Sequence, residues 1–300
     1  MISKEILITL FLLSLGADIV SARVDHLKRF RDEDQVAVVT GASRGLGLAT
    51  AARLLKEGIN VVAIARRDEL HANIKNLLPK PKDNPIPLGI LYAKKCDVTN
   101  EEEFLKIFEW INQTFKGISI IVNNAGGPIR ATLLGGKTDN WKTLLELNVI
   151  ALSVGTREAY RSMVRNNIAG HIIHMNSVTG HSFIGAFGHK MYNASKKAIT
   201  ALADGLRQEL KLKNSNIKVT SLSPGLTTTD ILVADEATRQ HNPYTSPKPS
   251  LDADNVADAI ITALDTPVEV LIAELIVVKV PTTIQYHSTP AGPFTIELQD

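Results

Sequence analysis

The sequence predicts an α/β fold built on a single doubly wound parallel sheet with helices on both faces. From residue 34 onward, short apolar runs alternate with amphipathic stretches, which is the pattern of strands and their covering helices in such a sheet. Several of the apolar runs are continuous, as expected for strands buried on both faces. With 300 residues, of which 44% are hydrophobic, the chain can form one large core.

The individual elements follow from the same patterns. The apolar runs predict strands at residues 36–40, 60–65, 90–94, 118–123, 170–176, 217–223 and 270–276. Helical periodicity predicts helices at residues 45–57, 68–77, 101–115, 140–166, 192–213 and 254–264. Four prolines between residues 79 and 87 predict a loop. The segment 227–250 has turn residues without firm periodicity and is the better candidate for a substrate lid.

Charge and cysteine content exclude several classes of protein. The net charge is only +2, and no block of basic residues resembles a nucleic-acid footprint, so we expect a small-molecule partner and no nucleic acid. Cys96 is the only cysteine, which excludes an intramolecular disulfide and a cysteine-based metal site. His171, His174, His181 and His189 lie close together in the sequence but lack the spacing of a metal site, so no metal is expected.

Residues 1–22 precede the predicted domain and are typical of a secretory signal peptide. Their apolar run, about ten residues, is shorter than the ~20 residues that span a bilayer, and small residues near Ala22 suit a signal peptidase. Glu5 and Asp18 are unusual in a signal peptide. An uncleaved segment that contacts the membrane through residues 6–20 and an untargeted extension therefore remain alternatives. We expect the secretory pathway, with secretion or membrane association as the outcome.

The first chemical motif is the loop at residues 40–47, Thr-Gly-Ala-Ser-Arg-Gly-Leu-Gly, between a predicted strand and a predicted helix. There, glycines let the backbone approach a pyrophosphate, and the helix N-terminus favours the anion. The alternative is a turn in which glycine only relieves backbone strain. The context favours a Rossmann-type dinucleotide-binding domain over residues 34–280, followed by a tail at 281–300. The expected cofactor contacts in the loop are Gly41, Ser43, Arg44, Gly45, Leu46 and Gly47.

The end of the second predicted strand indicates which dinucleotide is bound. NAD enzymes of this architecture place a carboxylate there on the ribose 2′-hydroxyl, but this strand runs into Arg66 and Arg67 before any acid. A guanidinium can hold a 2′-phosphate, and Arg44 could reach the same phosphate from the glycine-rich loop. The sequence therefore predicts NADP(H). The alternative is that both arginines are solvated residues at a helix start, which suits Arg67 better than Arg66.

A second set of residues predicts proton transfer. Tyr192 and Lys196 are spaced to share one face of a helix. A neighbouring positive charge favours the phenolate, so we expect Lys196 to lower the phenol pKa from its usual value of about 10. Tyr192 is then a candidate general acid/base. Ser177, at the end of a predicted strand, could stabilise the oxygen of an alcohol or carbonyl substrate. Alone, a Tyr-x-x-x-Lys pattern is usually structural, and its weight here comes from the other motifs.

Together these motifs resemble those of the short-chain dehydrogenase/reductase family over residues 35–276. The shared set includes the glycine-rich loop, Asn-Asn-Ala-Gly after the fourth strand, Tyr-x-x-x-Lys and a later Pro-Gly. The resemblance implies that Asn148 completes a catalytic tetrad with Ser177, Tyr192 and Lys196 by holding a water in a proton relay behind the lysine. It also implies cofactor contacts from Tyr192 and Lys196 themselves and from Asp97, Val98, Asn124, Ala125, Gly126, Pro224, Gly225, Thr227 and Thr229.

Within the family, Ala65-Arg66-Arg67 and the turn ending Gly180-His181 resemble the branch of insect farnesol dehydrogenases and dehydrogenase/reductase member 11. This implies an oxidoreductase that transfers hydride between NADP(H) and an alcohol or carbonyl substrate, an apolar isoprenoid alcohol or a steroid. It also implies a homodimer or homotetramer. The N-terminal apolar segment and Thr227-Thr228 depart from the branch pattern.

Two other functions remain open from the sequence. One is a non-catalytic NADPH-binding or sensory protein, which would not need Ser177, Tyr192 and Lys196 together. The other is a nucleotide-sugar epimerase or dehydratase, which shares the Tyr/Lys chemistry. Those enzymes usually carry a larger C-terminal substrate domain, whereas only 24 residues follow Ile276 here.

Overall fold

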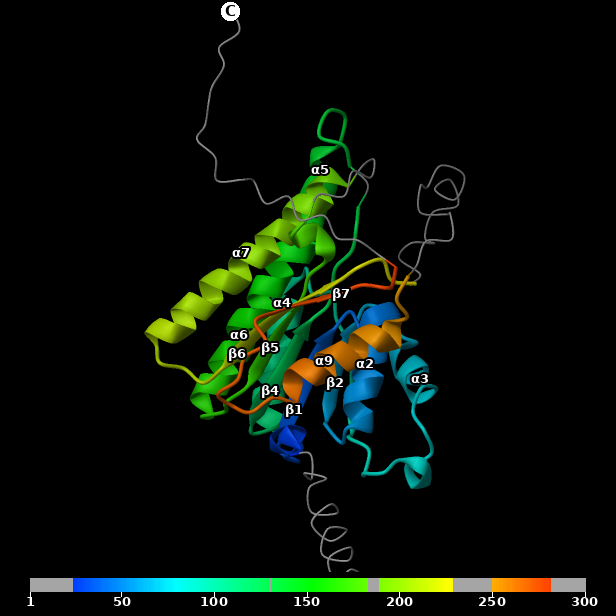
Figure 1. Cartoon of the computed structure of the whole chain (residues 1–300), viewed down its shortest axis with the longest axis vertical. Coiled ribbons are helices and arrows are strands. Elements are labelled where there is room, and N and C mark those ends of the chain that lie inside the picture. Colours follow the sequence, from blue (N-terminus) through cyan, green and yellow to red (C-terminus); the bar gives the residue numbers. More distant parts are fainter. Residues whose placement is uncertain (1–23, 130, 183–188, 229–249, 282–300) are drawn as a thin grey trace, which may run out of the picture.

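The computed structural model describes residues 24–129, 131–182, 189–228 and 250–281. The predicted signal segment, Thr229, most of the predicted lid and nearly all of the C-terminal tail lie outside these residues. A seven-stranded parallel sheet forms the centre of the molecule, with strand order β3-β2-β1-β4-β5-β6-β7 (Figure 1). The predicted fold class is confirmed.

All seven predicted strands are present. Their bounds are β1 (Gln35–Thr40), β2 (Val61–Ala65), β3 (Leu91–Lys95), β4 (Gly117–Asn123), β5 (His171–Met175), β6 (Lys218–Pro224) and β7 (Glu274–Val277). The central strands are buried along their whole length, because helices cover both faces. β7 begins four residues later than predicted. The segment before β7 is instead hydrogen-bonded to side chains of β6. Lys218 Nζ donates to Val270 O, and Thr220 Oγ1 donates to Ile272 O.

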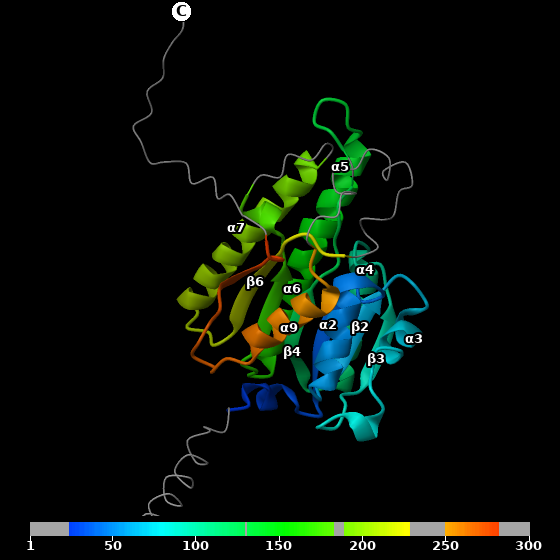
Figure 2. The same cartoon turned by 45° about the vertical axis from the view of Figure 1, so that its right-hand side comes forward.

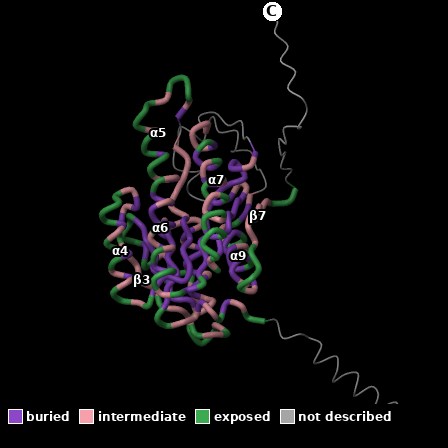
Figure 3. The backbone as a smooth tube through the Cα atoms, turned by 90° about the vertical axis from the view of Figure 1, so that its left-hand side faces the viewer, coloured by how far each residue is buried: buried purple, intermediate pink, exposed green. Residues whose placement is uncertain are grey.

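Two helical layers enclose the sheet. The helices α2 (Gly45–Lys56), α3 (Leu70–Lys75) and α9 (Ala253–Leu264) cover one face, where Leu54 and Ile260 belong to one buried cluster. The helices α4 (Glu101–Thr114), α6 (Ala151–Arg165) and α7 (Lys190–Leu212) cover the other, with Phe104 and Met163 in a second cluster. Figure 2 shows α2 and α9 packed on the same side of the sheet. Buried residues concentrate between the layers (Figure 3).

The single helix predicted at residues 140–166 is interrupted. It consists of α5 (Thr138–Leu145), a π-helical turn at Glu146–Ile150, and α6. The π-helical turn contains Asn148, whose side chain is bonded to groups outside the helix. Such turns are rare and frequently mark functional sites. The sequence analysis predicts one continuous helix here, so the π-helical turn is a difference from that prediction.

Short 3-10 turns occur at His26–Phe30, Pro81–Asp83 and Val178–Gly180. The second lies in the proline-rich segment predicted as a loop, and the third follows Ser177 at the end of β5. Among the helices of the described ranges, none is long and apolar enough to cross a membrane.

Candidate active site

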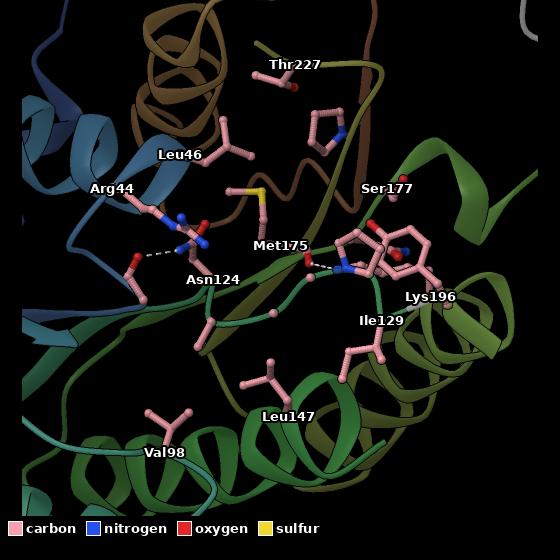
Figure 4. A pocket seen from close by; sticks show the side chains of 18 of the residues that line it. Arg44, Leu46, Val98, Asn124, Ile129, Leu147, Met175, Ser177, Lys196 and Thr227 are labelled. Carbon is pink, nitrogen blue, oxygen red and sulfur yellow. Dashed lines mark hydrogen bonds between the residues drawn. The ribbon is translucent and has the colours of Figure 1, made fainter. Parts of the chain in front are cut away.

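A cavity of about 780 Å³ opens at the carboxyl ends of the strands. It lies where the strand order reverses between β1 and β4, the usual ligand position in an open α/β sheet. In Figure 4, Arg44 and Asn124 lie on one side of the cavity, and Ser177 and Lys196 lie on the other. The predicted site residues that line it are Gly41, Ser43, Arg44, Leu46, Arg66, Arg67, Asp97, Val98, Asn124, Ala125, Gly126, Ser177, Tyr192, Lys196, Pro224, Gly225 and Thr227.

Three predicted site residues of the described ranges do not line the cavity. Gly45 and Gly47 belong to the first turn of α2, and Asn148 is buried and does not reach the cavity surface. Gly41 has φ +68° and Gly45 has φ +56°, backbone conformations that favour glycine. A Cβ atom at Gly47 would lie 2.4 Å from Asn124 Nδ2. Glycine is therefore needed for the loop to pack this closely on the end of β4.

Thr40 and Asn124 join the ends of the two central strands. The Thr40 hydroxyl oxygen accepts hydrogen bonds from the backbone N–H groups of Asn124 (3.0 Å) and Ala125 (2.9 Å). In return, Asn124 Nδ2 donates to Thr40 O (2.8 Å) and Gly41 O (3.3 Å). These bonds fix the glycine-rich loop against β4. Thr40 was not among the predicted site residues, although its place directly before the first glycine was the available signal.

Arginine side chains surround the end of β2. Arg66 Nη1 lies 3.6 Å from Asp97 Oδ2, and Arg67 Nη1 donates to Ser43 Oγ at 3.4 Å. Partial burial raises the pKa of Asp97, but hydrogen bonds from Thr99 and the charge of Arg66 outweigh it, so the pKa is lowered overall. Asp97 is therefore ionised at neutral pH. Arg67 has a direct contact with the glycine-rich loop, which the sequence did not predict for it.

The residues of this cavity fit a phosphorylated dinucleotide. The cavity volume of about 780 Å³ lies in the range of known ligand sites, about 300–1,000 Å³. Guanidinium groups stand at one end, where a 2′-phosphate would be bound. Near Ser177, two buried polar atoms, Asn176 Oδ1 and Thr179 Oγ1, have no hydrogen-bond partner among the described residues. Both residues line the cavity with other parts of their side chains or backbone, while these two atoms are buried behind its wall.

Ser177, Tyr192 and Lys196 come together from two elements. Ser177 caps the 3-10 turn after β5, and its Oγ accepts a hydrogen bond from Thr179 N (3.2 Å). The side chains of Ser177 and Tyr192 both line the cavity, and Ser177 is close enough to the phenol to influence its pKa. Lys196, one turn further along α7, donates from Nζ to Met175 O at 2.8 Å, and its Nζ lies 5.8 Å from the centre of the Tyr192 ring.

Burial dominates the ionisation of this group. It raises the pKa of Tyr192 to about 12, and the Ser177 side chain opposes this only in part. Burial also lowers the pKa of Lys196 to about 7. The expected lowering of the phenol pKa by Lys196 is therefore not found in this structure, because desolvation disfavours both charged forms. The phenol is therefore neutral at pH 7 and carries the proton that a reduction would require.

Asn148 connects three parts of the site. Its Oδ1 accepts from Gly127 N (3.0 Å), and its Nδ2 donates to Gly127 O (3.2 Å) and Ser195 Oγ (3.0 Å). Ser195 directly precedes Lys196 and donates to Tyr192 O (2.8 Å). Asn148 thus fixes the loop after β4 against the start of α7. Its predicted relay through a water stays a prediction.

Two of the four histidines that lie close together in the sequence are buried in hydrogen-bonding contacts. His171 Nε2 lies 2.8 Å from Thr220 Oγ1, and His174 Nε2 lies 3.0 Å from Thr156 Oγ1. Burial lowers the pKa of both histidines to about 3, so they are neutral. Within the described ranges, no three His, Cys, Asp or Glu side chains are grouped to hold a metal ion.

Several wall residues were missed by sequence reasoning. They come from loops and helix ends whose side-chain directions no periodic pattern specifies, and they include Pro128, Ile129, Thr143, Leu147, Val178, His189 and Leu226. Most are apolar. His189 lies one residue before α7, and its ring centre is 6.3 Å from that of Tyr192. The reacting groups thus have a largely apolar surface beside them.

With this geometry in place, comparison with known proteins identifies the class. Residues 35–240 match the family described as short chain dehydrogenase, and the chain belongs to that family of oxidoreductases. Among curated relatives, dehydrogenase/reductase SDR family member 11 of Gallus gallus is 40% identical over 245 residues, 80% of this chain and 94% of the relative. Farnesol dehydrogenase of Aedes aegypti is 39% identical over 247 residues, again 80% and 94%. The resemblance expected from the motifs is confirmed.

Solved structures agree on the fold. An alcohol dehydrogenase of Thermococcus sibiricus, complexed with 5-hydroxy-NADP, superposes with a TM-score of 0.70 at 23% identity, covering 84% of this chain and 99% of that one. A closed form of serine dehydrogenase complexed with NADP+ has a TM-score of 0.67 at 26% identity, with 81% and 94% covered.

Proposed function

We propose that the protein is an NADP(H)-dependent alcohol dehydrogenase or carbonyl reductase acting on an apolar isoprenoid alcohol, similar to farnesol, or on a steroid. The observation that carries the proposal is that Ser177, Tyr192 and Lys196 lie together on the wall of the cavity that the glycine-rich loop also lines. A protein that only binds a nucleotide has no use for these three residues together.

The side chains divide the reaction between them. The bound cofactor supplies or accepts hydride. Ser177 binds the substrate oxygen, and Tyr192 donates its proton to that oxygen in reduction or accepts one in oxidation. Lys196, held by Met175 O, lies where it can bind the ribose of the nicotinamide half. A hydride and a proton move to different atoms, so two separate groups are required.

The preference for NADP(H) is supported by the arginines at the end of β2. Arg66 and Arg67 line the cavity together with Arg44 from the glycine-rich loop. Two charge-assisted bonds of roughly 1.5 kcal/mol each would favour a 2′-phosphate by on the order of a hundredfold. The serine dehydrogenase described above, 26% identical, is itself complexed with NADP+.

The apolar substrate class is supported by the wall near Tyr192. Ile129, Leu147 and Val178 line this part of the cavity, and apolar surface favours ligands that bury hydrocarbon. The 39% identity to a farnesol dehydrogenase agrees with an isoprenoid alcohol.

A substrate panel tests the proposal. Protein lacking residues 1–22 is incubated with isoprenoid alcohols and NADP+, or with steroid ketones and small carbonyls and NADPH, and the absorbance of NADPH is followed. We expect turnover of at least one apolar alcohol or ketone and its loss in Tyr192→Phe. Tight NADPH binding without turnover of any compound would instead favour a non-catalytic binding protein.

We also propose that residues 1–22 direct the protein to the secretory pathway and that it forms a homodimer or homotetramer. The support for the first is the apolar run of that segment. The support for the second is a set of exposed apolar side chains on α5, on the π-helical turn and on α7, namely Leu145, Ile150 and Leu202. Sedimentation velocity measures the oligomer, and a single monomer boundary at micromolar concentration would contradict it.

A further inference from the structure

The carboxylate of Glu274, on the edge strand β7, contacts three hydrogen-bonding side chains outside the cavity. Glu274 Oε1, at the start of β7, accepts from Ser223 Oγ (2.7 Å) and Ser221 Oγ (3.1 Å) of β6. The same oxygen lies 3.1 Å from His181 Nε2. None of these four residues lines the cavity, so the cluster does not contact a ligand there.

The donor roles in the cluster can be assigned. His181 Nε2 lies 2.9 Å from Ser223 Oγ as well as 3.1 Å from the carboxylate. The hydrogen of Ser223 is directed to Glu274, and a carboxylate only accepts. Nε2 therefore carries a hydrogen and donates it toward both oxygens. Glu274 acts as the acceptor on which the cluster converges.

His181 and Ser177 flank the same short turn. His181 follows the 3-10 turn Val178–Gly180 that Ser177 caps. Gly180 N donates to Ser177 O (2.8 Å), and His181 N donates to Val178 O (3.1 Å). The turn is short and internally bonded, so a contact that fixes the His181 ring also restricts the position of Ser177.

A second connection fixes the other side of Ser177. Asn176 Nδ2 donates to Thr200 Oγ1 (2.9 Å) on α7 and lies 3.3 Å from Ser221 Oγ. Thr200 lies one helical turn after Lys196, and its Oγ1 donates in turn to Gly180 O at 3.2 Å. The residues on both sides of Ser177 are therefore tied to the same cluster and to the helix that carries Tyr192.

We propose that Glu274 and His181 are positioning residues, which hold the turn of Ser177 in place beside Tyr192. The inference rests on the proposed function. Simple packing of an edge strand would need only apolar side chains, whereas a partly buried carboxylate is costly unless its oxygen is well bonded. Loss of the acceptor lets the turn move, and small displacements of a reacting group are costly in rate.

The kinetic test compares three variants. Glu274→Ala should lower kcat by about ten- to a hundredfold and leave the Kd of NADPH within about twofold of the parent, because the arginine end of the cavity is untouched. Glu274→Gln should recover most of kcat, since its amide oxygen can accept the same bonds. Asp258→Ala is the matched control: it removes a carboxylate that joins α9 to Arg53 of α2, away from the cavity, and should leave kcat unchanged.

A second measurement does not depend on turnover. Amide hydrogen exchange of residues 176–182 should become roughly fivefold faster or more in Glu274→Ala, the effect of losing about one hydrogen bond, and stay parental in Glu274→Gln. His181→Ala breaks the cluster without altering β7, and it should accelerate exchange to the same extent. It therefore provides the test even if Glu274→Ala does not fold. Parental exchange in both alanine variants, or a glutamine variant as impaired as alanine, overturns the positioning role. A parent protein without any activity contradicts the proposed function, while the exchange result still decides the role of the cluster.

Discussion

Lys196 Nζ donates a 2.8 Å hydrogen bond to the backbone carbonyl of Met175, the last residue of β5. The bond joins α7 to the strand that leads, two residues later, into Ser177. The ammonium is thereby held by a neutral carbonyl oxygen in a buried site, which explains why desolvation decides its pKa.

Tyr192→Phe should abolish most of the activity and leave binding intact. Phenylalanine keeps the ring and removes only the transferable proton. We expect normal folding, an NADPH affinity close to the parent by fluorescence titration, and a loss of at least ~10²-fold in turnover, the low end of general acid/base contributions. Near-parental turnover on a substrate that the parent reduces well would show that another group is the acid.

The buried Lys196 should make the stability of the protein depend on pH. Its pKa is about 7 in the folded protein, whereas the ordinary pKa of a lysine is 10.5, so the unfolded chain binds more protons between these two pH values. The free energy of unfolding should therefore rise with pH over this window, by up to about 1.4 kcal/mol per pH unit. Below pH 7 the cost of burying the ammonium is present in full.

Urea unfolding of the parent and of Lys196→Met from pH 7 to pH 10 measures this effect. The difference between the two proteins should change in favour of the parent as the pH rises. Lys218, whose pKa burial lowers to about 8, contributes in the same direction in both proteins and cancels in the difference. A difference that is constant with pH would mean that Lys196 titrates near its usual value.

The arginines should set the cofactor preference. Arg66→Ala should weaken NADPH binding by about tenfold, and Arg44→Ala with Arg66→Ala by on the order of a hundredfold, from roughly 1.5 kcal/mol for each charged bond. NADH affinity should change little. Arg161→Ala, an exposed arginine on α6 paired with Glu158, is the control. A parent that uses both cofactors with equal efficiency would refute the assignment, and a larger effect in Arg67→Ala would move it to Arg67.

Residues 1–24, fused to a reporter in a eukaryotic cell, should direct the reporter into the secretory pathway. The apolar run of this segment is the reason. Carbonate washing of the membranes then separates a cleaved signal, which releases the reporter, from an anchor, which retains it. A full-length reporter that stays in the cytosol would exclude both.

Much of the fold could be predicted because it depends on local pattern. Continuous apolar runs such as residues 36–39, Val-Ala-Val-Val, are typical of strands buried on both faces of a parallel sheet. The ends of strands then bring Thr40, Asn124 and Ser177 to one edge of the sheet without further information. The glycine-rich loop and the Tyr192/Lys196 pair were recognisable because each has its spacing within a few residues.

The rest depends on contacts between distant parts of the chain. Glu274 contacts His181, which is 93 residues away in the sequence, and Asn148 contacts Ser195, which is 47 residues away. Helical or strand periodicity does not predict contacts of this kind. The pKa of Tyr192 could not be predicted either. The sequence shows that Lys196 is one turn away, but it does not show that Met175 O holds the ammonium or how deeply both groups are buried.

The central place of β1 has a consequence for synthesis. The Thr40 hydroxyl finds its partners 84 and 85 positions later, in Asn124 and Ala125. A ribosome adding about 5–20 residues per second needs on the order of 4–20 s to supply them. Until then β1 can pair with β2 but not with β4. Its other edge keeps unpaired backbone N–H and C=O groups, the kind of edge that promotes aggregation. We expect a nascent chain stalled before residue 117 to need a chaperone to stay soluble.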